Sequence, residues 1–156
     1  MRRDEIANEL SIRAFEFFYW FSRFEFALKE NGYLRSHDVG KKAEPGWDEF
    51  VAKWSEGYSP SRNAIELLRA PPETQVVGEN SQLTWRVTEL SDYRSDLAKV
   101  VRLVKTVRNN LFHGGKHGGA GWSNPSRTES LLTNATAVLD QLAELAVIEA
   151  DYQKRY

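Results

Sequence analysis

The stretch DYRSDLAKVVRLVKTVRNNLFHGG, residues 92–115, decides how this 156-residue chain folds. Its apolar side chains recur every three or four residues, which is the spacing that places them on one face of a helix. They are Val100, Leu103, Val104, Val107 and Leu111. The two glycines that follow are typical of a helix end. The pattern predicts a helix over residues 92–112 with one face in a core.

Two more long helices are predicted, one toward each end of the chain. Residues 4–31 carry an apolar stripe and end at Gly32, and residues 126–152 follow a capping box of Ser126 and Glu129. The first stripe is Leu10, Ala14, Phe17, Phe21, Phe24 and Leu28, and the last helix has Leu131, Ala135, Val138, Leu142 and Leu145. The spacing in the last helix is typical of bundle seams.

The first helix also carries a second apolar stripe, formed by Phe15, Tyr19 and Phe26. It lies nearly opposite the first stripe, and a helix that is apolar on both sides needs a cover on both sides. Either a partner subunit or the short helices near Trp47 and Trp54 could supply the second cover.

The middle of the chain is less regular. Residues 33–45 have the polar composition of a loop. Pro45-Gly46-Trp47 opens a short helix that closes near Gly57, and residues 60–69 form another short helical segment. Residues 75–87 are compatible with a small β-hairpin. The predicted fold class is therefore all-α: one domain, residues 1–156, with two or three long helices and short helices between them.

The composition excludes several classes of protein. There is no cysteine, so disulfides and thiolate chemistry are absent. The three histidines, His37, His113 and His117, do not have the spacing of a metallohydrolase motif. No apolar run of about 18 residues occurs, and acidic residues near the start argue against a targeting peptide. We therefore expect a cytoplasmic protein with no membrane segment and no cofactor.

The charge is unevenly distributed although the net charge is only −1. No acidic residue lies between Asp96 and Glu129, a segment that contains Lys99, Arg102, Lys105, Arg108, Lys116 and Arg127. A local basic segment of this kind suits a polyanionic partner such as RNA. The alternative is a solvated helix face that clusters by chance.

The most informative motif is RNNLFHGGK, residues 108–116. On a regular helix His113 lies about 140° round from Arg108, because each residue turns roughly 100°. Within one chain the two side chains can share a face only if the helix loosens at His113. Alternatively, the motifs of two chains meet across a symmetric dimer, so that each side chain faces its counterpart. The alternative is an ordinary helix end, where cationic side chains favour the negative end of the dipole.

Glu25 is a second candidate, because it lies about 60° from the centre of the main stripe of the first helix. A carboxylate so close to a core needs a cationic or hydrogen-bonding partner. Arg108 is one candidate, Lys29 is another, and the carboxylate could also turn to the surface.

The Arg-x4-His pattern, with asparagine after the arginine and glycine after the histidine, resembles the signature of the HEPN superfamily. It is close to the form found in bacterial defence and toxin systems. FFYWFSRFE, residues 17–25, resembles the aromatic-rich first helix of the plasmid-borne group of that superfamily. The resemblance covers the first helix and the last two, about half of the chain, and leaves residues 33–90 without a counterpart.

The resemblance implies an up-and-down helical bundle, often a homodimer, that cleaves RNA without a metal ion. Arg108 and His113 match the catalytic pair, and Asn109 matches the usual polar residue between them. Glu25 and Arg23 are supporting candidates on the first helix. The local basic segment would supply the RNA contacts, namely Arg102, Lys105, Lys116 and His117. Such a protein acts as a toxin or an antiviral-defence effector, with a cognate antitoxin or another partner protein.

The chemistry of the pair fits this function. Histidine exchanges protons near neutral pH, and arginine binds the non-bridging oxygens of a phosphate. Attack by the 2′-hydroxyl would leave a 2′,3′-cyclic phosphate and a 5′-hydroxyl. One histidine in each chain cannot easily be both base and acid, whereas a dimer supplies two. Two alternatives stay open: a non-catalytic module that binds RNA, nucleotide or a regulated enzyme, and a structural adaptor that binds partners through its aromatic stripe.

Overall fold

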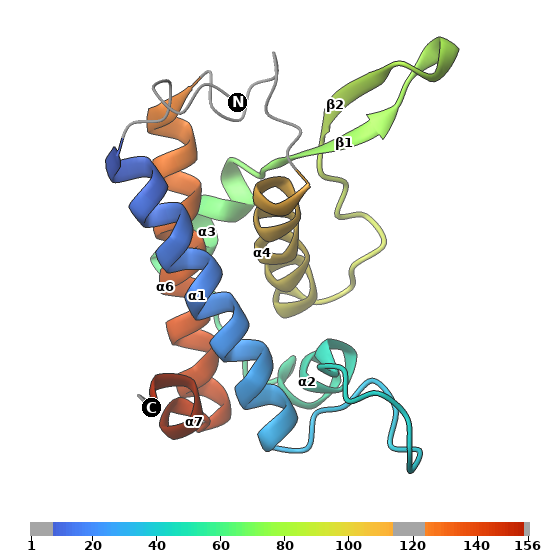
Figure 1. The fold of residues 1–156 in the computed structure, drawn as a ribbon, viewed down its shortest axis with the longest axis vertical. Helices are drawn as coiled ribbons and strands as arrows, with labels where there is room; N and C mark the ends of the chain where they lie inside the picture. Colours follow the sequence, from blue (N-terminus) through green and yellow to red (C-terminus); the bar gives the residue numbers. More distant parts are fainter. Residues whose placement is uncertain (1–7, 114–123, 155–156) are drawn as a thin grey trace.

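The computed structural model describes residues 8–113 and 124–154. Three long helices form its body: α1 (Asn8–Glu30), α4 (Asp96–Phe112) and α6 (Pro125–Ala146). Their direction alternates along the chain, so that α1 and α6 run the same way and cross, while α4 runs in the opposite direction (Figure 1). The mainly α-helical fold class predicted from periodicity is confirmed.

Local sequence signals set two of the helix ends. Gly32 adopts a left-handed backbone with φ of 79°, as expected for the residue that terminates α1. The amide of Tyr33 then donates to the carbonyl of Leu28 at 2.9 Å. The helix α4 begins at Asp96 rather than at 92, because the hydroxyl of Ser95 accepts from the amide of Ala98. Serine is a favoured N-cap residue for this reason.

The predicted capping box of the last helix is wrong. The N-cap of α6 is Asn124, whose side chain accepts from the amide of Arg127 at 3.1 Å, and Pro125 occupies the first turn. Glu129 instead forms an ion pair with Arg13 of α1 at 2.9 Å.

The prediction of one continuous helix to Tyr152 is also wrong. Val147 has a left-handed backbone with φ of 56°, and a separate short helix, α7 (Glu149–Gln153), follows it. The turn buries Ile148 and Tyr152. Tertiary burial of these two side chains therefore accompanies the break, which helical periodicity does not reveal.

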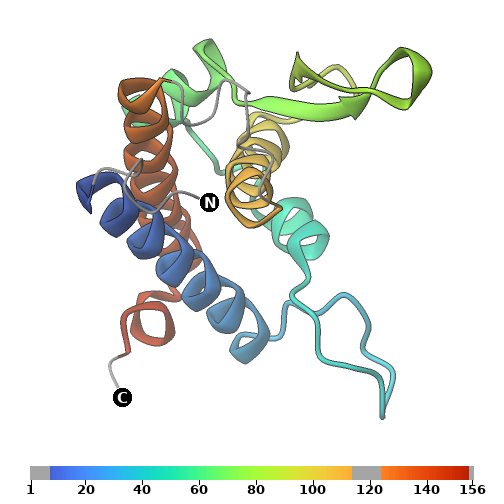
Figure 2. The ribbon, with the colours of Figure 1, turned by 45° about the horizontal axis from the view of Figure 1, so that its top comes forward.

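The elements between α1 and α4 are short. They are α2 (Trp47–Trp54), α3 (Arg62–Arg69), β1 (Glu73–Val77), the 3-10 turn η2 (Glu79–Ser81) and β2 (Leu83–Val87). The two strands pair antiparallel, which confirms the predicted hairpin. The hairpin projects from the helical body (Figures 1 and 2). The side-chain amide of Asn110 in α4 donates to the carbonyl of Glu73 at 2.7 Å, which ties the base of the hairpin to α4.

The core lies where α1, α4 and α6 meet, and α2 is docked on it by aromatic packing. Trp47 stacks against Phe21 and Phe24, with ring centroids 5.7 and 5.0 Å apart. All three side chains are buried. The short helix α2 therefore covers the main stripe of α1, not the second one.

The second stripe of α1 stays largely uncovered within one chain. Phe15 is 70% exposed and Tyr19 is 42% exposed, and Ile12 beside them is 57% exposed. Phe26 is half-buried, with the guanidinium of Arg23 4.6 Å from its ring centroid. The short helices near Trp47 and Trp54, one of the two covers that the sequence left open, do not cover this stripe. None of the described helices is long and apolar enough to cross a membrane.

Candidate functional site

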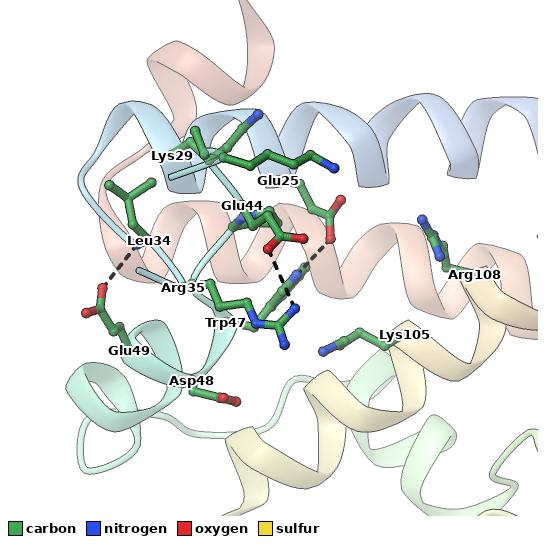
Figure 3. A pocket seen from close by; sticks show the side chains of 14 residues that line it. Glu25, Lys29, Leu34, Arg35, Glu44, Trp47, Asp48, Glu49, Lys105 and Arg108 are labelled. Carbon is green, nitrogen blue, oxygen red and sulfur yellow. Dashed lines mark hydrogen bonds and ion pairs between the residues drawn. The ribbon is translucent and has the colours of Figure 1, made fainter. Parts of the chain in front are cut away.

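A pocket of about 760 Å³ lies between α1, α4 and residues 34–49, which comprise the segment before α2 and the first turn of α2. Figure 3 shows its lining side chains converging from these three parts of the chain. Charged residues dominate the lining: Glu25, Lys29, Arg35, Lys42, Glu44, Asp48, Glu49, Lys105 and Arg108. The pocket therefore brings two of the sequence-predicted residues, Glu25 and Arg108, to the same surface.

Arg108 and Lys105 form the α4 side of the pocket, one turn apart. The guanidinium of Arg108 lies 5.7 Å from the ring centroid of Phe21 and 5.2 Å from that of Phe112. Its Nη1 donates to the side-chain oxygen of Asn109 at 3.0 Å. Its Nε is buried and has no hydrogen-bond partner among the described residues. Arg108 is thus held by rings and an amide, and within residues 8–113 and 124–154 it meets no carboxylate at ion-pair distance.

Glu25 forms the α1 side of the pocket, but its partner differs from both candidates. Its carboxylate Oε1 accepts from the indole Nε1 of Trp47 at 2.9 Å. Neither Arg108 nor Lys29 comes within ion-pair distance of it in the described structure, although both line the same pocket. The sequence identified Trp47 only as the start of a short helix and did not indicate that its indole N–H would bind Glu25.

The third side of the pocket is the segment 33–46, which the sequence identified only as a polar loop. It doubles back on itself through a bridge between Leu34 and Pro45, and the amide of Arg35 donates to the carbonyl of Glu44 at 3.0 Å. Gly46 approaches the main chain of Leu34 so closely that an added Cβ would lie 2.6 Å from three of its atoms. The sequence signal for this wall was the Pro45-Gly46 pair, where only glycine permits such an approach.

Glu49 fastens the same segment to α2. Its carboxylate accepts from the amide of Leu34 at 3.1 Å, and the Nε2 atom of His37 lies 2.7 Å from it. The hydrogen bond with His37, followed by that from Leu34, lowers the pKa of Glu49 below its ordinary value. Both side chains are largely exposed, so this contact orients the segment more than it stabilises the fold.

His113 lies at the end of α4 and outside the pocket. Its amide donates to the carbonyl of Asn109 at 2.9 Å, and its backbone, with φ of −87° and ψ of 7°, leaves the helical conformation directly after Phe112. The imidazole is exposed and packs edge-on against Phe112, with ring centroids 5.4 Å apart. Phe112 thus contacts both predicted catalytic side chains, but Arg108 and His113 are not brought together within one chain.

The remaining predicted residues are dispersed. Arg23 is buried on the other side of α1 and donates to the carbonyls of Asp151 and Tyr152, which makes it an anchor for α7. Arg102 is half-buried on α4 and does not line the pocket. Lys116 and His117 lie outside the described residues.

Chemically, the pocket offers one oriented carboxylate and several cations, which suits a ligand that carries both an anionic group and N–H donors. Within residues 8–113 and 124–154, no group of three or more acidic or histidine side chains is placed to hold a metal ion.

Comparison with protein-family models, curated proteins and solved structures finds no match to this chain. The resemblance to the HEPN superfamily therefore stays a prediction from the sequence motif.

Proposed function

We propose that this protein is a metal-independent endoribonuclease of the HEPN type, in which Arg108 binds the reacting phosphate and His113 transfers protons. The observation that supports this most is the state of Arg108. Its guanidinium is fixed by Asn109 and two phenyl rings, yet no carboxylate among the described residues neutralises it. An arginine held in this way is prepared for an external anion, and a phosphate matches its N–H donors.

The reaction follows from the two side-chain types. A neutral imidazole of His113 accepts the proton of the 2′-hydroxyl, and the 2′-oxygen attacks the adjacent phosphorus. Arg108 stabilises the charge that builds up on the non-bridging oxygens. The bond to the 5′-oxygen then breaks, and that oxygen takes a proton from a second, protonated imidazole. The products are a 2′,3′-cyclic phosphate and a 5′-hydroxyl.

A homodimer would supply the second imidazole and would also bring together the two catalytic residues. Three adjacent exposed side chains of α1, Ile12, Phe15 and Tyr19, support such an interface. Burying side chains of this size is worth about 1.5–3 kcal/mol each, and contiguous apolar patches on a surface usually mark an interface. We propose a two-fold dimer in which Arg108 of one copy serves His113 of the other.

The cleavage assay uses single-stranded RNA in EDTA. Wild-type protein is expected to cleave the RNA and to leave cyclic-phosphate ends, whereas Arg108→Ala and His113→Ala should lose at least about a hundredfold in rate. The helical circular dichroism should stay the same in all three proteins. Undiminished cleavage by both variants would refute the site, and loss of wild-type activity in EDTA would point to a metal-dependent nuclease.

A mixing experiment tests the shared site. If each cleavage needs His113 from both chains, a heterodimer of one wild-type and one His113→Ala chain is inactive. Random exchange in an equal mixture should therefore lower the activity to about half of that of the same amount of unmixed wild-type protein, because half of the wild-type chains enter mixed dimers. Sedimentation should show a dimer for the wild type and a monomer for Tyr19→Glu. A mixture that keeps the full wild-type activity although heterodimers form would contradict the shared site.

A non-catalytic RNA- or nucleotide-binding module is the second candidate, and the position of His113 outside the pocket favours it. On this candidate function, wild-type protein should bind RNA without cleaving it.

On the catalytic proposal, the protein would act as a toxin or defence effector that is inhibited by an antitoxin. Its expression in a bacterial host should then arrest growth, and His113→Ala should abolish the arrest.

A further inference from the structure

We propose that the pocket between α1, α4 and the segment 33–46 is a guanosine-nucleotide subsite for the RNA. In it, Lys105 and Arg35 bind a phosphate and Glu25 accepts hydrogen bonds from the base. The choice of RNA as the source of the nucleotide rests on the proposed function. The volume of about 760 Å³ lies within the range of roughly 300–1,000 Å³ that is typical of small-ligand pockets.

The phosphate end is defined by cations from two different parts of the chain. Lys105 has no carboxylate at ion-pair distance among the described residues, and its Nζ lies 6.0 Å from the ring centroid of Trp47. Arg35 is paired with Glu44 at 3.7 Å, in a contact whose side chains are 75% and 43% exposed. An ion pair this exposed contributes little free energy, so a phosphate can replace the carboxylate of Glu44 with little loss of stability. Figure 3 shows both cationic ends directed toward the space between α4 and the segment 33–46.

The base end is defined by the fixed carboxylate of Glu25. The indole of Trp47 donates to one oxygen, and Trp47 is only 5% exposed, so it cannot turn away. The other oxygen, Oε2, has no donor among the described residues. A carboxylate accepts through both oxygens and matches two adjacent N–H donors. Guanine presents such a pair at N1 and N2, whereas the other bases place a single donor group next to acceptors.

The mixture of charges favours a nucleotide over a longer polyanion. Four carboxylates line the pocket beside its five cations, and a polyphosphate would be repelled by them. Stacking is not the means of recognition, because Trp47 is the aromatic residue of the described lining and its ring is buried. Recognition of the base therefore depends on hydrogen bonds, which discriminate between bases more sharply than stacking does.

Arg108 connects this subsite with the reaction. It lines the same pocket, one turn beyond Lys105 on α4. A nucleotide bound by Lys105 and Glu25 would place the neighbouring phosphate near Arg108. Cleavage should therefore occur next to guanosine, and the segment 33–46, which carries Arg35, takes part in choosing the cleavage position.

The test measures binding without cleavage, by calorimetry with GMP, UMP and inorganic phosphate. Wild-type protein should bind GMP at least about tenfold more tightly than UMP or phosphate. Lys105→Met should weaken GMP binding by about tenfold or more, while Lys99→Met, two turns earlier on α4 and outside the pocket, should leave it within about twofold. Equal affinities for the three ligands, or equal effects of the two lysine variants, would overturn the proposal.

Glu25→Gln is the sharpest variant, because glutamine keeps an oxygen for the indole of Trp47 and so preserves the packing. It replaces the other oxygen by an NH₂ group, which opposes the N–H donors of guanine. The preference for GMP over UMP should therefore disappear while the circular dichroism stays the same. A retained preference would overturn the role of Glu25.

The same measurements separate this inference from the proposed function. If GMP binds as described and RNA is not cleaved, the endoribonuclease fails and the nucleotide site stands. If RNA is cleaved through Arg108 and His113 and GMP is not preferred, the subsite fails and the endoribonuclease stands. If both hold, sequencing of the cleaved ends should show guanosine next to the cut, and Glu25→Gln should randomise that position.

Discussion

Gly46→Ala tests the conformation of the segment 33–46, which carries Arg35 and forms one side of the pocket. A Cβ at this position would lie 2.6 Å from the N, C and O atoms of Leu34, well inside ordinary van der Waals contact. These are main-chain atoms, so no change of rotamer can relieve the overlap. The segment must open instead, and the hydrogen bond from the amide of Gly46 to the carbonyl of Tyr33, 2.9 Å long, is the first that this movement strains.

The magnitude follows from three terms. Overpacking costs about 1–3 kcal/mol, and a lost hydrogen bond costs about 0.5–1.5 kcal/mol. Alanine also reduces the conformational entropy of the unfolded chain, which stabilises the folded protein by about 0.4–1 kcal/mol. The free energy of unfolding should therefore fall by about 0.5–4 kcal/mol. At roughly 2–4 °C per kcal/mol for a chain of this size, a central loss of about 2 kcal/mol lowers Tm by about 4–8 °C.

Gly57→Ala is the matched control, because no heavy atom lies within 4 Å of its added Cβ and no left-handed φ is required. Its free energy of unfolding should stay the same or rise slightly. Both variants are measured by guanidinium unfolding followed by circular dichroism. Gly46→Ala should also weaken GMP binding, since Arg35 moves with the segment. If the two alanine variants unfold within about 0.5 kcal/mol of each other, the close approach of Gly46 does not constrain the wall.

Three further predictions concern individual contacts. Arg23→Met should lower the free energy of unfolding by about 1–3 kcal/mol, because the main-chain carbonyls of Asp151 and Tyr152 lose their donor. It should also make the helix α7 more sensitive to proteolysis. Unchanged stability would contradict the anchoring role of Arg23. Asn110→Ala should make the β1–β2 hairpin more sensitive to limited proteolysis than in the wild type, with the helical circular dichroism retained; equal cleavage rates would contradict it. His37→Ala should raise the pKa of Glu49, measured by NMR titration, toward its ordinary value. Because the pKa of Glu49 is lower in the folded than in the unfolded protein, its contact with His37 stabilises the fold at pH values above the unfolded-state pKa. This contribution is lost as the pH falls through the folded-state pKa. An unchanged pKa of Glu49 in His37→Ala would refute this link.

The long helices were predictable because their signals are local. A stripe that recurs every three or four residues is read directly from the chain, and Gly32 ends α1 since glycine adopts a left-handed backbone at little cost. The hairpin of residues 73–87 was predictable for a similar reason, because β-branched residues flank a glycine turn. Such features depend on neighbours in sequence and not on distant contacts.

The helix ends that were wrong depended on contacts across the fold. Asn124 caps α6 in place of Ser126, and the helix breaks at Val147 where the turn buries Ile148. The chain contains several asparagines and serines that could serve as caps. Which one does so is decided by where the helix must start in order to pack against α1.

The candidate site shows the same division. The sequence by itself singled out Arg108 and His113 through the Arg-x4-His pattern, and Glu25 because a carboxylate beside an apolar stripe needs a partner. Only the tertiary structure decided that Glu25 is held by Trp47, that Arg23 anchors α7, and that the segment 33–46 forms a wall opposite α4. The physical reason is that periodicity fixes the direction of a side chain from its own helix, whereas its partner depends on how separate elements pack.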